Sequence, residues 1–390
     1  MKFKSLYIKN FRILEDFQVK KLGRLNLIVG KNNSGKSTVL EALRIYSGNA
    51  NPVLLSRIAD EHDEIPASND KDIMDNDRAF PFESFFTGRC FPSDEEKTIL
   101  IGENENASDA LQLRHTYLIK REEPLEDGRS MRSITRPIKK SELSENIDAF
   151  HAISVSKGDI IGFIPLDEPF RPRRFNSPFE NQINLPCSYI STRFISQDEL
   201  ADAWDKIALT GYETHLKTVL KFIDDDFENI AFIKNEDRDA DLSFARSFYS
   251  RSPKRFAKVK LNNIKQPIPL NSMGDGMLRV VQLALKASSA AGGIFLIDEF
   301  DNGLHFSVQE KIWDWLFDLA KEFNIQVFAT THGGDCVDSF VKVALGKKAG
   351  EGVLFRVGRS ATKSNKGKII ATEFSEEKLA TISQADVEVR

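Results

Sequence analysis

One short segment, Gly30-Lys31-Asn32-Asn33-Ser34-Gly35-Lys36-Ser37, limits the folds open to this chain more than any other feature. It matches the pattern G-x-x-x-x-G-K-[ST] at every fixed position. The apolar run Leu25–Val29 before it is typical of a buried strand, and apolar residues at helical spacing predict a helix from Lys36 to about Tyr46. A turn rich in glycine and asparagine can match this pattern by chance, but the flanking strand and helix favour a phosphate-binding loop.

The side chains of this loop have the chemistry that a nucleotide requires. Gly30 and Gly35 let the backbone approach phosphate oxygens, and the N–H groups of the loop and of the helix N-terminus face them. Lys36 can neutralise the β- and γ-phosphates, and the Ser37 hydroxyl can bind Mg²⁺.

A second segment with matching chemistry lies far downstream. Asp298 and Glu299 directly follow the apolar run Ile294–Ile297. The loops that bind ligands gather at the carboxyl ends of the strands in an α/β sheet. We therefore expect Asp298 to position the metal ion and Glu299 to polarise an attacking water. Strands often end in solvated acids, so this signal is weak alone and becomes strong beside the phosphate-binding loop.

Two further segments have the pattern of nucleotide contacts, and each has an ordinary structural alternative. His332 ends the run Ala329-Thr330-Thr331-His332, at the mouth of the same predicted sheet, although a lone histidine is more often structural. The turn Asn271–Gly276 precedes an apolar helix, where an anion can dock, but the turn can equally well cap that helix.

The order of elements predicts the fold class. Residues 2–9 have the alternation of a strand, a helix is expected at about 307–322, and a strand at Ile325–Ala329. Residues 98–165 contain strand-like runs, and 197–223 have helical spacing. We expect an α/β fold with a mixed, mainly parallel core sheet, an antiparallel β part, and an inserted region of helices and loops.

Composition places the chain among globular proteins. Its 390 residues are 41% hydrophobic, and 54 basic against 58 acidic residues give a net charge of −4. The three widely separated cysteines argue against a disulfide framework and a four-ligand zinc site, and favour the reducing cytoplasm. Neither a signal peptide nor an apolar run of membrane-spanning length is evident, so we expect no contact with a membrane.

Taken in order, these segments resemble the ABC-type ATPases of the branch that includes the SMC, RecF and OLD (overcoming-lysogenization-defect) proteins. Ile8-Lys9-Asn10-Phe11-Arg12 is similar to the opening "I-x-N-F-R" of that branch, and the turn 272–276 to its signature motif. The OLD-like "AAA domain" ATP-binding proteins are a narrower match, through 272–276, Leu296–Glu299, Asn302–His305 and Ala329–His332.

The resemblance implies a head-to-tail homodimer, or a higher homo-oligomer, that sandwiches ATP and Mg²⁺ between subunits. Lys36, Ser37 and Asp298 would bind phosphate and Mg²⁺, Glu299 would be the catalytic base, and His332 would sense the γ-phosphate. The other nucleotide-binding positions that it implies are Arg12, Gly30, Asn33, Ser34, Gly35, Thr38 and, from the second subunit, Ser272, Gly274, Asp275 and Gly276.

The resemblance also implies a split head. Residues 1–50 and 265–390 would form the ATPase head, and 51–264 an insertion with the helical segment 197–223. His305 stands where many transporter-type relatives have aspartate, and the glutamine loop has no clear position, with Gln112 as a candidate. These departures disfavour a role in transport.

Two functions remain open. In the first, ATP hydrolysis serves genome defence, such as antiviral defence, or repair, together with DNA or RNA and a separately encoded effector protein. Basic clusters at 129–140, 171–174 and 251–260 are the candidate nucleic-acid contacts. In the second, the protein is a nucleotide-gated scaffold that sequesters a partner protein without touching nucleic acid. Because few residues follow His332, we expect no nuclease active site like that of the OLD nucleases, and Asp224-Asp225-Asp226 is more typical of a solvated helix end than of a metal site.

Overall fold

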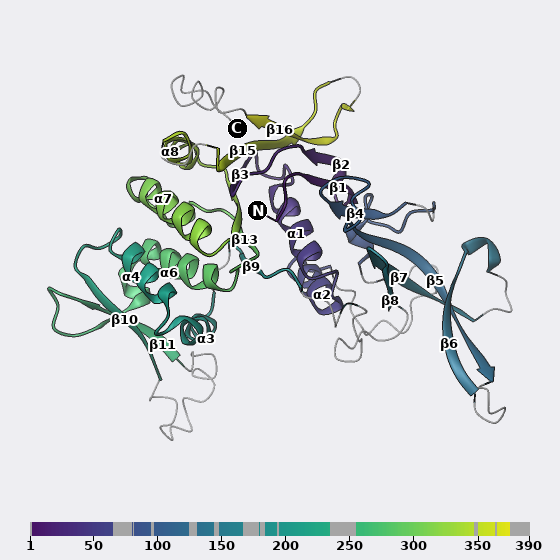
Figure 1. The fold of residues 1–390 in the computed structure, drawn as a ribbon, viewed down its shortest axis with the longest axis horizontal. Coiled ribbons are helices and arrows are strands. Elements are labelled where there is room, and N and C mark those ends of the chain that lie inside the picture. Colours follow the sequence, from purple (N-terminus) through teal and green to yellow (C-terminus); the bar gives the residue numbers. More distant parts are fainter. Residues whose placement is uncertain are drawn as a thin grey trace.

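Two β-sheets meet at the N-terminal segment of the chain, and helices cover the mainly parallel one (Figure 1). The computed structural model describes residues 2–64, 80, 82–94, 97–124, 131–143, 148–166, 179, 184–192, 195–234, 255–346, 350–362 and 365–374. Within these residues, no helix is both long and apolar enough to cross a bilayer.

The first sheet has six strands in the order β16-β15-β3-β14-β13-β9. All neighbouring pairs are parallel except β15 with β16. Three of its inner strands are buried at every residue, because helices cover both faces, and this explains their continuous apolar sequences. The strands are β3 (Leu25–Val29), β9 (Cys187–Ile190), β13 (Ile294–Ile297), β14 (Gln326–Thr331), β15 (Gly352–Arg359) and β16 (Ile369–Phe374).

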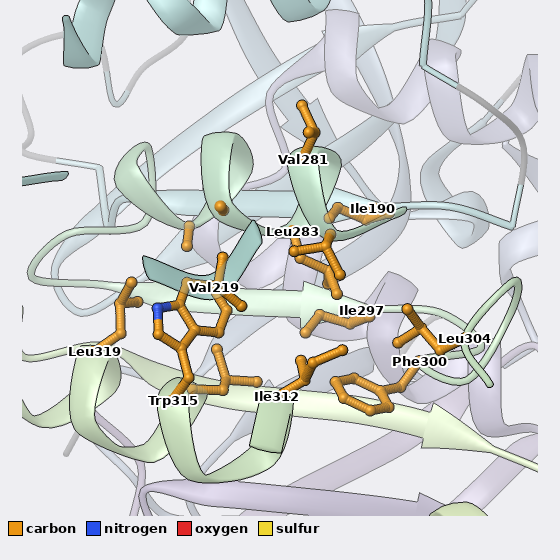
Figure 2. Close-up of a cluster of buried hydrophobic side chains, with 14 of the residues drawn as sticks. Ile190, Val219, Val281, Leu283, Ile297, Phe300, Leu304, Ile312, Trp315 and Leu319 are labelled. Carbon is orange, nitrogen blue, oxygen red and sulfur yellow. The ribbon is translucent and has the colours of Figure 1, made fainter. Parts of the chain in front are cut away.

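Alternate residues of these strands enter two separate hydrophobic cores. In β13, Phe295 and Ile297 pack with helices α6 (Asp275–Ser288), α7 (Phe306–Glu322) and α8 (Gly334–Leu345). Ile294 and Leu296 point to the other face, toward α1 (Lys36–Ser47) and α2 (Pro52–Asp60). Figure 2 shows the first core, where Ile297 lies among the side chains of α6 and α7. This packing fixes the strand that carries Asp298 and Glu299 at its end.

The second sheet is antiparallel, in the order β2-β1-β4-β5-β7-β8, with β6 paired to β5. The β5–β6 ribbon projects away from the rest of the molecule (Figure 1). Its strands are β1 (Leu6–Phe11), β2 (Leu14–Val19), β4 (Ile99–Gly102), β5 (Leu111–Pro124), β6 (Met131–Ile138), β7 (Ala149–Lys157) and β8 (Ile160–Pro165). The short 3₁₀ helices η2 (Glu83–Phe85) and η3 (Lys140–Glu142) also belong to this part of the chain.

A third group of elements packs on α6, at the lower left of Figure 1. It comprises α3 (Gln197–Ile207), α4 (Gly211–Leu220), a small sheet of β10 (Phe227–Lys234), β11 (Arg255–Leu261) and β12 (Ile268–Pro269), and the 3₁₀ helix η6 (Leu270–Met273). The predicted helical segment 197–223 is therefore two helices, separated at Leu209, which has a positive φ of 64°.

The predicted fold class is confirmed, with a mainly parallel sheet and a separate antiparallel one. Several elements differ from prediction: the first strand is Leu6–Phe11 instead of 2–9, and neither β2 nor α8 was expected. The division into a head and an insertion stays a prediction. Two strands inside 51–264 pair with strands of the predicted head: β9 pairs with β13, and β4 pairs with β1.

Candidate functional site

The phosphate-binding loop joins β3 to α1, and its glycines are required by its geometry. Gly30 has a φ of 149°, and a Cβ atom there would lie 2.3 Å from the carbonyl oxygen of Val357. Gly35 has a φ of 102°, and Asn33 one of 61°. The loop therefore adopts a conformation that a chain without glycine at these positions would resist.

The ammonium group of Lys36 lies at the centre of this loop. Its Nζ donates hydrogen bonds to the carbonyl oxygens of Gly30, at 2.7 Å, and Lys31, at 3.0 Å. Burial lowers the pKa of Lys36, while the nearby Asp298 and Glu299 act in the opposite direction. The geometry thus places a cation where phosphate oxygens would enter the loop.

Ser37 lies beside Asp298, although the two residues are far apart in the sequence. The Ser37 hydroxyl lies 3.0 Å from Oδ2 of Asp298, and the Thr330 hydroxyl donates to Oδ1 at 2.6 Å. Asp298 is only 7% exposed. A hydroxyl and a carboxylate are hard oxygen ligands that suit Mg²⁺, so these residues fit the predicted ion. Among the described residues no group of three or more His, Cys, Asp or Glu is arranged to hold a metal ion.

Glu299 and His332 lie together at the mouth of the site. Glu299 has a positive φ of 48°, and its N–H donates to the Thr330 hydroxyl at 2.8 Å. Its Oε1 is 3.9 Å from Nδ1 of His332, and both side chains are partly exposed. A carboxylate held in this position is accessible to water, as a general base must be.

A short network fixes the turn that carries His332. The Thr331 hydroxyl donates to Asp301 at 2.7 Å and accepts the N–H of Gly333 at 3.0 Å. A Cβ atom on Gly333 would lie 2.4 Å from Oδ2 of Asp301. Asp301 was not among the predicted site residues, although it lies two positions after Glu299.

Arg279 holds the backbone of Asp298 and Glu299, and it was not among the residues predicted from the sequence. It is 3% exposed, and its Nη2 donates to the carbonyl oxygens of Asp298, at 2.9 Å, and Glu299, at 2.7 Å. Nη1 lies 3.4 Å from the carbonyl oxygen of Ser191. Burial lowers the pKa of Arg279 to about 10. One signal could have revealed it: a lone arginine among the apolar residues of a buried helix.

Arg12 lines the same cavity as the loop, but its charge is matched within the protein. Nη1 and Nη2 each lie 2.9 Å from an oxygen of Glu64, and Nε lies 2.8 Å from Oε2 of Glu41. Although burial alone raises the pKa of Glu64, its bonds with Arg12 and Ser84 hold that pKa below its ordinary value. Arg12 was predicted from the sequence as a nucleotide-binding residue, but its partners Glu41 and Glu64 were not predicted.

The phosphate-binding loop, Arg12, Asp298 and Glu299 face one cavity of about 660 Å³, whereas His332 and Arg279 are not among the residues that line it. Its volume is in the usual range for a small-ligand site. It is lined by Arg12, Ile13, Asn32, Asn33, Ser34, Gly35, Lys36, Ser37, Thr38, Glu41, His62, Ser84, Gly88, Arg89, Asp298 and Glu299.

The signature turn does not line this cavity. Ser272, Gly274 and Asp275 are exposed, and Gly274 has a positive φ of 85° with open space around it. Gly276 packs against the turn after β13, where a Cβ atom would lie 3.3 Å from the carbonyl oxygen of Gly303. Within the described residues, the chain therefore does not bring its own signature turn to its own phosphate-binding loop.

Three other candidates have local structural roles. Gln112 lies on β5, paired with Leu100 of β4, and does not line the cavity. His305 caps α7, with its Nδ1 2.8 Å from the Ser307 hydroxyl. The run Asp224–Asp226 forms a turn in which the N–H of Asp226 donates to the Asp224 side chain at 2.9 Å.

The structure describes only parts of the predicted basic clusters. Residues 171–174, 129–130 and 251–254 lie outside the described residues. In the third cluster, Arg255 is paired through both Nη atoms with the carboxylate of Asp205. Its charge is thus matched by a neighbouring acid.

The family model described as "AAA domain, putative AbiEii toxin, Type IV TA system" matches residues 25–332. A Helicobacter pylori (strain ATCC 700392 / 26695) protein named ATP/GTP phosphatase is 23% identical over 354 residues, covering 86% of each chain. The family match and this relative confirm the prediction of an ATPase with a P-loop domain.

Solved SMC heads align over nearly the whole chain. An SMC head bound to the C-winged helix domain of ScpA gives a TM-score of 0.44 at 14% identity, covering 98% of this chain and 100% of that one. The SMC head domain from Thermotoga maritima gives 0.41 at 12% identity, covering 96% and 100%.

Proposed function

Because the chain belongs to the family described as AAA domain, putative AbiEii toxin, Type IV TA system, we propose that it binds ATP with Mg²⁺ in the cavity beside Lys36 and hydrolyses the ATP. The observation that carries this proposal is the meeting of Ser37 and Asp298 at 3.0 Å, directly beside Glu299. These two side chains would hold Mg²⁺, which when bound neutralises charge on the transferring phosphoryl group.

The chain's own residues supply the other parts of the reaction. Lys36 binds the phosphates and balances their charge. The Glu299 carboxylate accepts a proton from the water that attacks the γ-phosphate. His332, 3.9 Å from Glu299, donates a hydrogen bond to a γ-phosphate oxygen, and Arg279 holds the backbone that carries the base.

We also infer that a second copy of the chain completes the site. The signature turn at Ser272–Gly276 is exposed and lies outside the cavity of its own chain, which supports action in trans in a head-to-tail dimer. Phe306, 60% exposed at the start of α7, offers an apolar contact beside the turn of Gly303. ATP would then link two heads, and its hydrolysis would release them.

The family description, which names a "putative AbiEii toxin, Type IV TA system", supports a role in genome defence with a separate effector protein. DNA or RNA is the candidate trigger in this function. The pairing of Arg255 with Asp205 favours the second candidate, a nucleotide-gated scaffold without nucleic-acid contact. Stimulation of ATP hydrolysis by DNA or RNA at low salt supports the first function, and its absence supports the second.

Substitution of Lys36 by alanine tests the nucleotide site. We expect Lys36→Ala to weaken ATP binding at least a hundredfold in titration calorimetry with Mg²⁺, because the phosphates lose the cation at the loop centre. Lys311→Ala, an exposed lysine of α7 outside the cavity, is the matched control and should bind ATP normally. Equal binding by Lys36→Ala and the wild type would exclude this cavity as the ATP site.

A further inference from the structure

A groove runs along the outer edge of the parallel sheet, separate from the nucleotide cavity. Two cavities, of about 840 Å³ and about 490 Å³, open beside β9 and the residues before it. Both are lined by Asn184, Leu185 and Pro186, so the two cavities adjoin the same segment, and we refer to them together as the groove. In Figure 1, β9 lies between α2 and α6 at the end of this sheet.

The backbone of β9 offers hydrogen-bonding groups to this groove. The carbonyl oxygen of Pro186 accepts a bond from the N–H of Ile294 in β13, at 2.8 Å, and that of Ile190 accepts one from Asp298, directly after β13, at 2.9 Å. Peptide groups along a strand point alternately to its two sides, so the N–H and C=O groups of Cys187 and Tyr189 point away from β13. In the described parts of the chain, no other strand pairs with that edge. Such an edge is a template for an added strand.

Ordered side chains of helices form the walls. Arg44 of α1 bonds Glu61 through both Nη atoms, at 2.6 Å and 2.9 Å, and its guanidinium lies 4.1 Å from the ring centroid of Tyr189. On the other side, Lys286 of α6 pairs with Glu199 of α3 at 2.6 Å. The groove is thus shaped before any partner arrives, which lowers the entropic cost of binding.

The charge of the groove is opposite to that of the whole protein. The larger cavity is lined by Arg44, Arg57 and Lys286 against Glu61 and Glu199. The smaller one adds Lys2 and Lys157 against Asp109. The excess is therefore basic, in a chain of net charge −4. Arg57 is exposed and forms no ion pair with the residues that the structure describes, so its charge is available to a ligand.

We propose that this groove binds an extended acidic segment of a partner protein, which adds to β9 as a further strand. The main-chain bonds to Cys187 and Tyr189 provide affinity, and the basic walls select acidic side chains. The inference rests on the proposed function only in taking the effector to be a protein. It also gives the effector a route to the ATPase site, because Ser191 follows β9 and its carbonyl oxygen contacts Arg279.

A designed peptide tests this proposal without knowledge of the partner. The probe is a fluorescein-labelled peptide of alternating valine and glutamate, measured by fluorescence anisotropy with the full chain. We expect saturable binding, with at least a tenfold loss when lysine replaces the glutamates and about a tenfold loss in Arg57→Glu. Lys311→Glu, an exposed charge reversal away from the groove, should bind the peptide like the wild type.

Several outcomes would overturn the proposal. They are no binding of the acidic peptide, equal binding of the lysine peptide, and equal losses in Arg57→Glu and Lys311→Glu. A change of molecular mass in light scattering of Arg57→Glu would instead assign the groove to a second copy of the chain. Lys36→Ala separates this proposal from that of the ATPase, because we expect it to lose ATP binding and keep peptide binding.

Discussion

The two walls of the nucleotide cavity are built in different ways. On the parallel-sheet side, Lys36 bonds only backbone carbonyls, and Asp298 is held by hydroxyl groups. On the antiparallel side, Arg12 is bound by Glu41 and Glu64. The charges of the first wall are thus not paired with each other as closely as those of the second, which are balanced internally. We propose that the first wall performs the chemistry and the second shapes the cavity.

The second wall rests on a cluster of aromatic and histidine rings. The N–H of Arg12 donates to the carbonyl oxygen of Phe85 at 2.8 Å, which ties β1 to η2. Nearby, the Phe91 ring stacks on His115, with centroids 4.0 Å apart. Nε2 of His115 lies 3.0 Å from Nδ1 of His151 across β5 and β7. This cluster supports the segment that brings Ser84 to Glu64.

The largest effect should come from removing the support of the first wall. Arg279→Ala leaves buried carbonyl oxygens of Asp298 and Glu299 without their donor, so we expect the free energy of unfolding to fall by about 3 kcal/mol. ATP turnover should fall with it, because the backbone of Glu299 loses its anchor. Urea denaturation and a phosphate-release assay measure both. Lys286→Ala, on the same helix but in a surface ion pair, should cost less than 1 kcal/mol, and a similar loss in both variants would contradict this role.

The second wall should be sensitive to acid. Burial lowers the pKa of His115 to about 4, below its ordinary value of 6.5, with a smaller contribution from His151. Between pH 4 and pH 6.5, His115 is more often protonated in the unfolded chain than in the folded one. Its neutral, buried form therefore costs no stability above about pH 6.5, and the free energy of unfolding decreases as the pH falls toward 4. We expect a loss of about 2 to 3 kcal/mol in the free energy of unfolding over that range. His115→Phe should remove this part of the pH dependence, and an unchanged slope would contradict the assignment.

A smaller effect tests the charge balance of the second wall. Glu64→Gln removes one negative charge from Arg12, so we expect ATP to bind about threefold to tenfold more tightly, with a loss of about 1 kcal/mol in the free energy of unfolding. Glu61→Gln is the matched control, because it disturbs a similar arginine pair outside the nucleotide cavity. Weaker ATP binding in Glu64→Gln would show that the balanced pair itself contacts the nucleotide.

The two walls also differ in how well the sequence predicts them. The first consists of short contiguous motifs at strand ends, so Lys36, Ser37 and Asp298 could be identified and expected to meet. The parallel sheet followed separately, from the alternation of helices with apolar strands. The second wall depends on pairs between distant segments, such as Arg12 with Glu64, and no local pattern signals those contacts.

Short elements were missed for a related reason. The four residues of β9, Cys187–Ile190, alternate between buried and half-buried and include a serine, so they lack the apolar run that identified β13. Only pairing with β13 makes them a strand of the parallel sheet. Gln112, a candidate whose flanking residues gave no further signal, lies in the antiparallel sheet and does not line the nucleotide cavity.

ATP turnover by Glu299→Gln tests whether Glu299 is the base of the first wall. The first wall predicts that this variant binds ATP like the wild type, hydrolyses it at least a hundredfold more slowly, and accumulates as an ATP-bound dimer in light scattering. Glu322→Gln, at the far end of α7, is the control and should turn over ATP normally. Hydrolysis by Glu299→Gln at the rate of the wild type would contradict the account, since the water would then need no base at the end of β13.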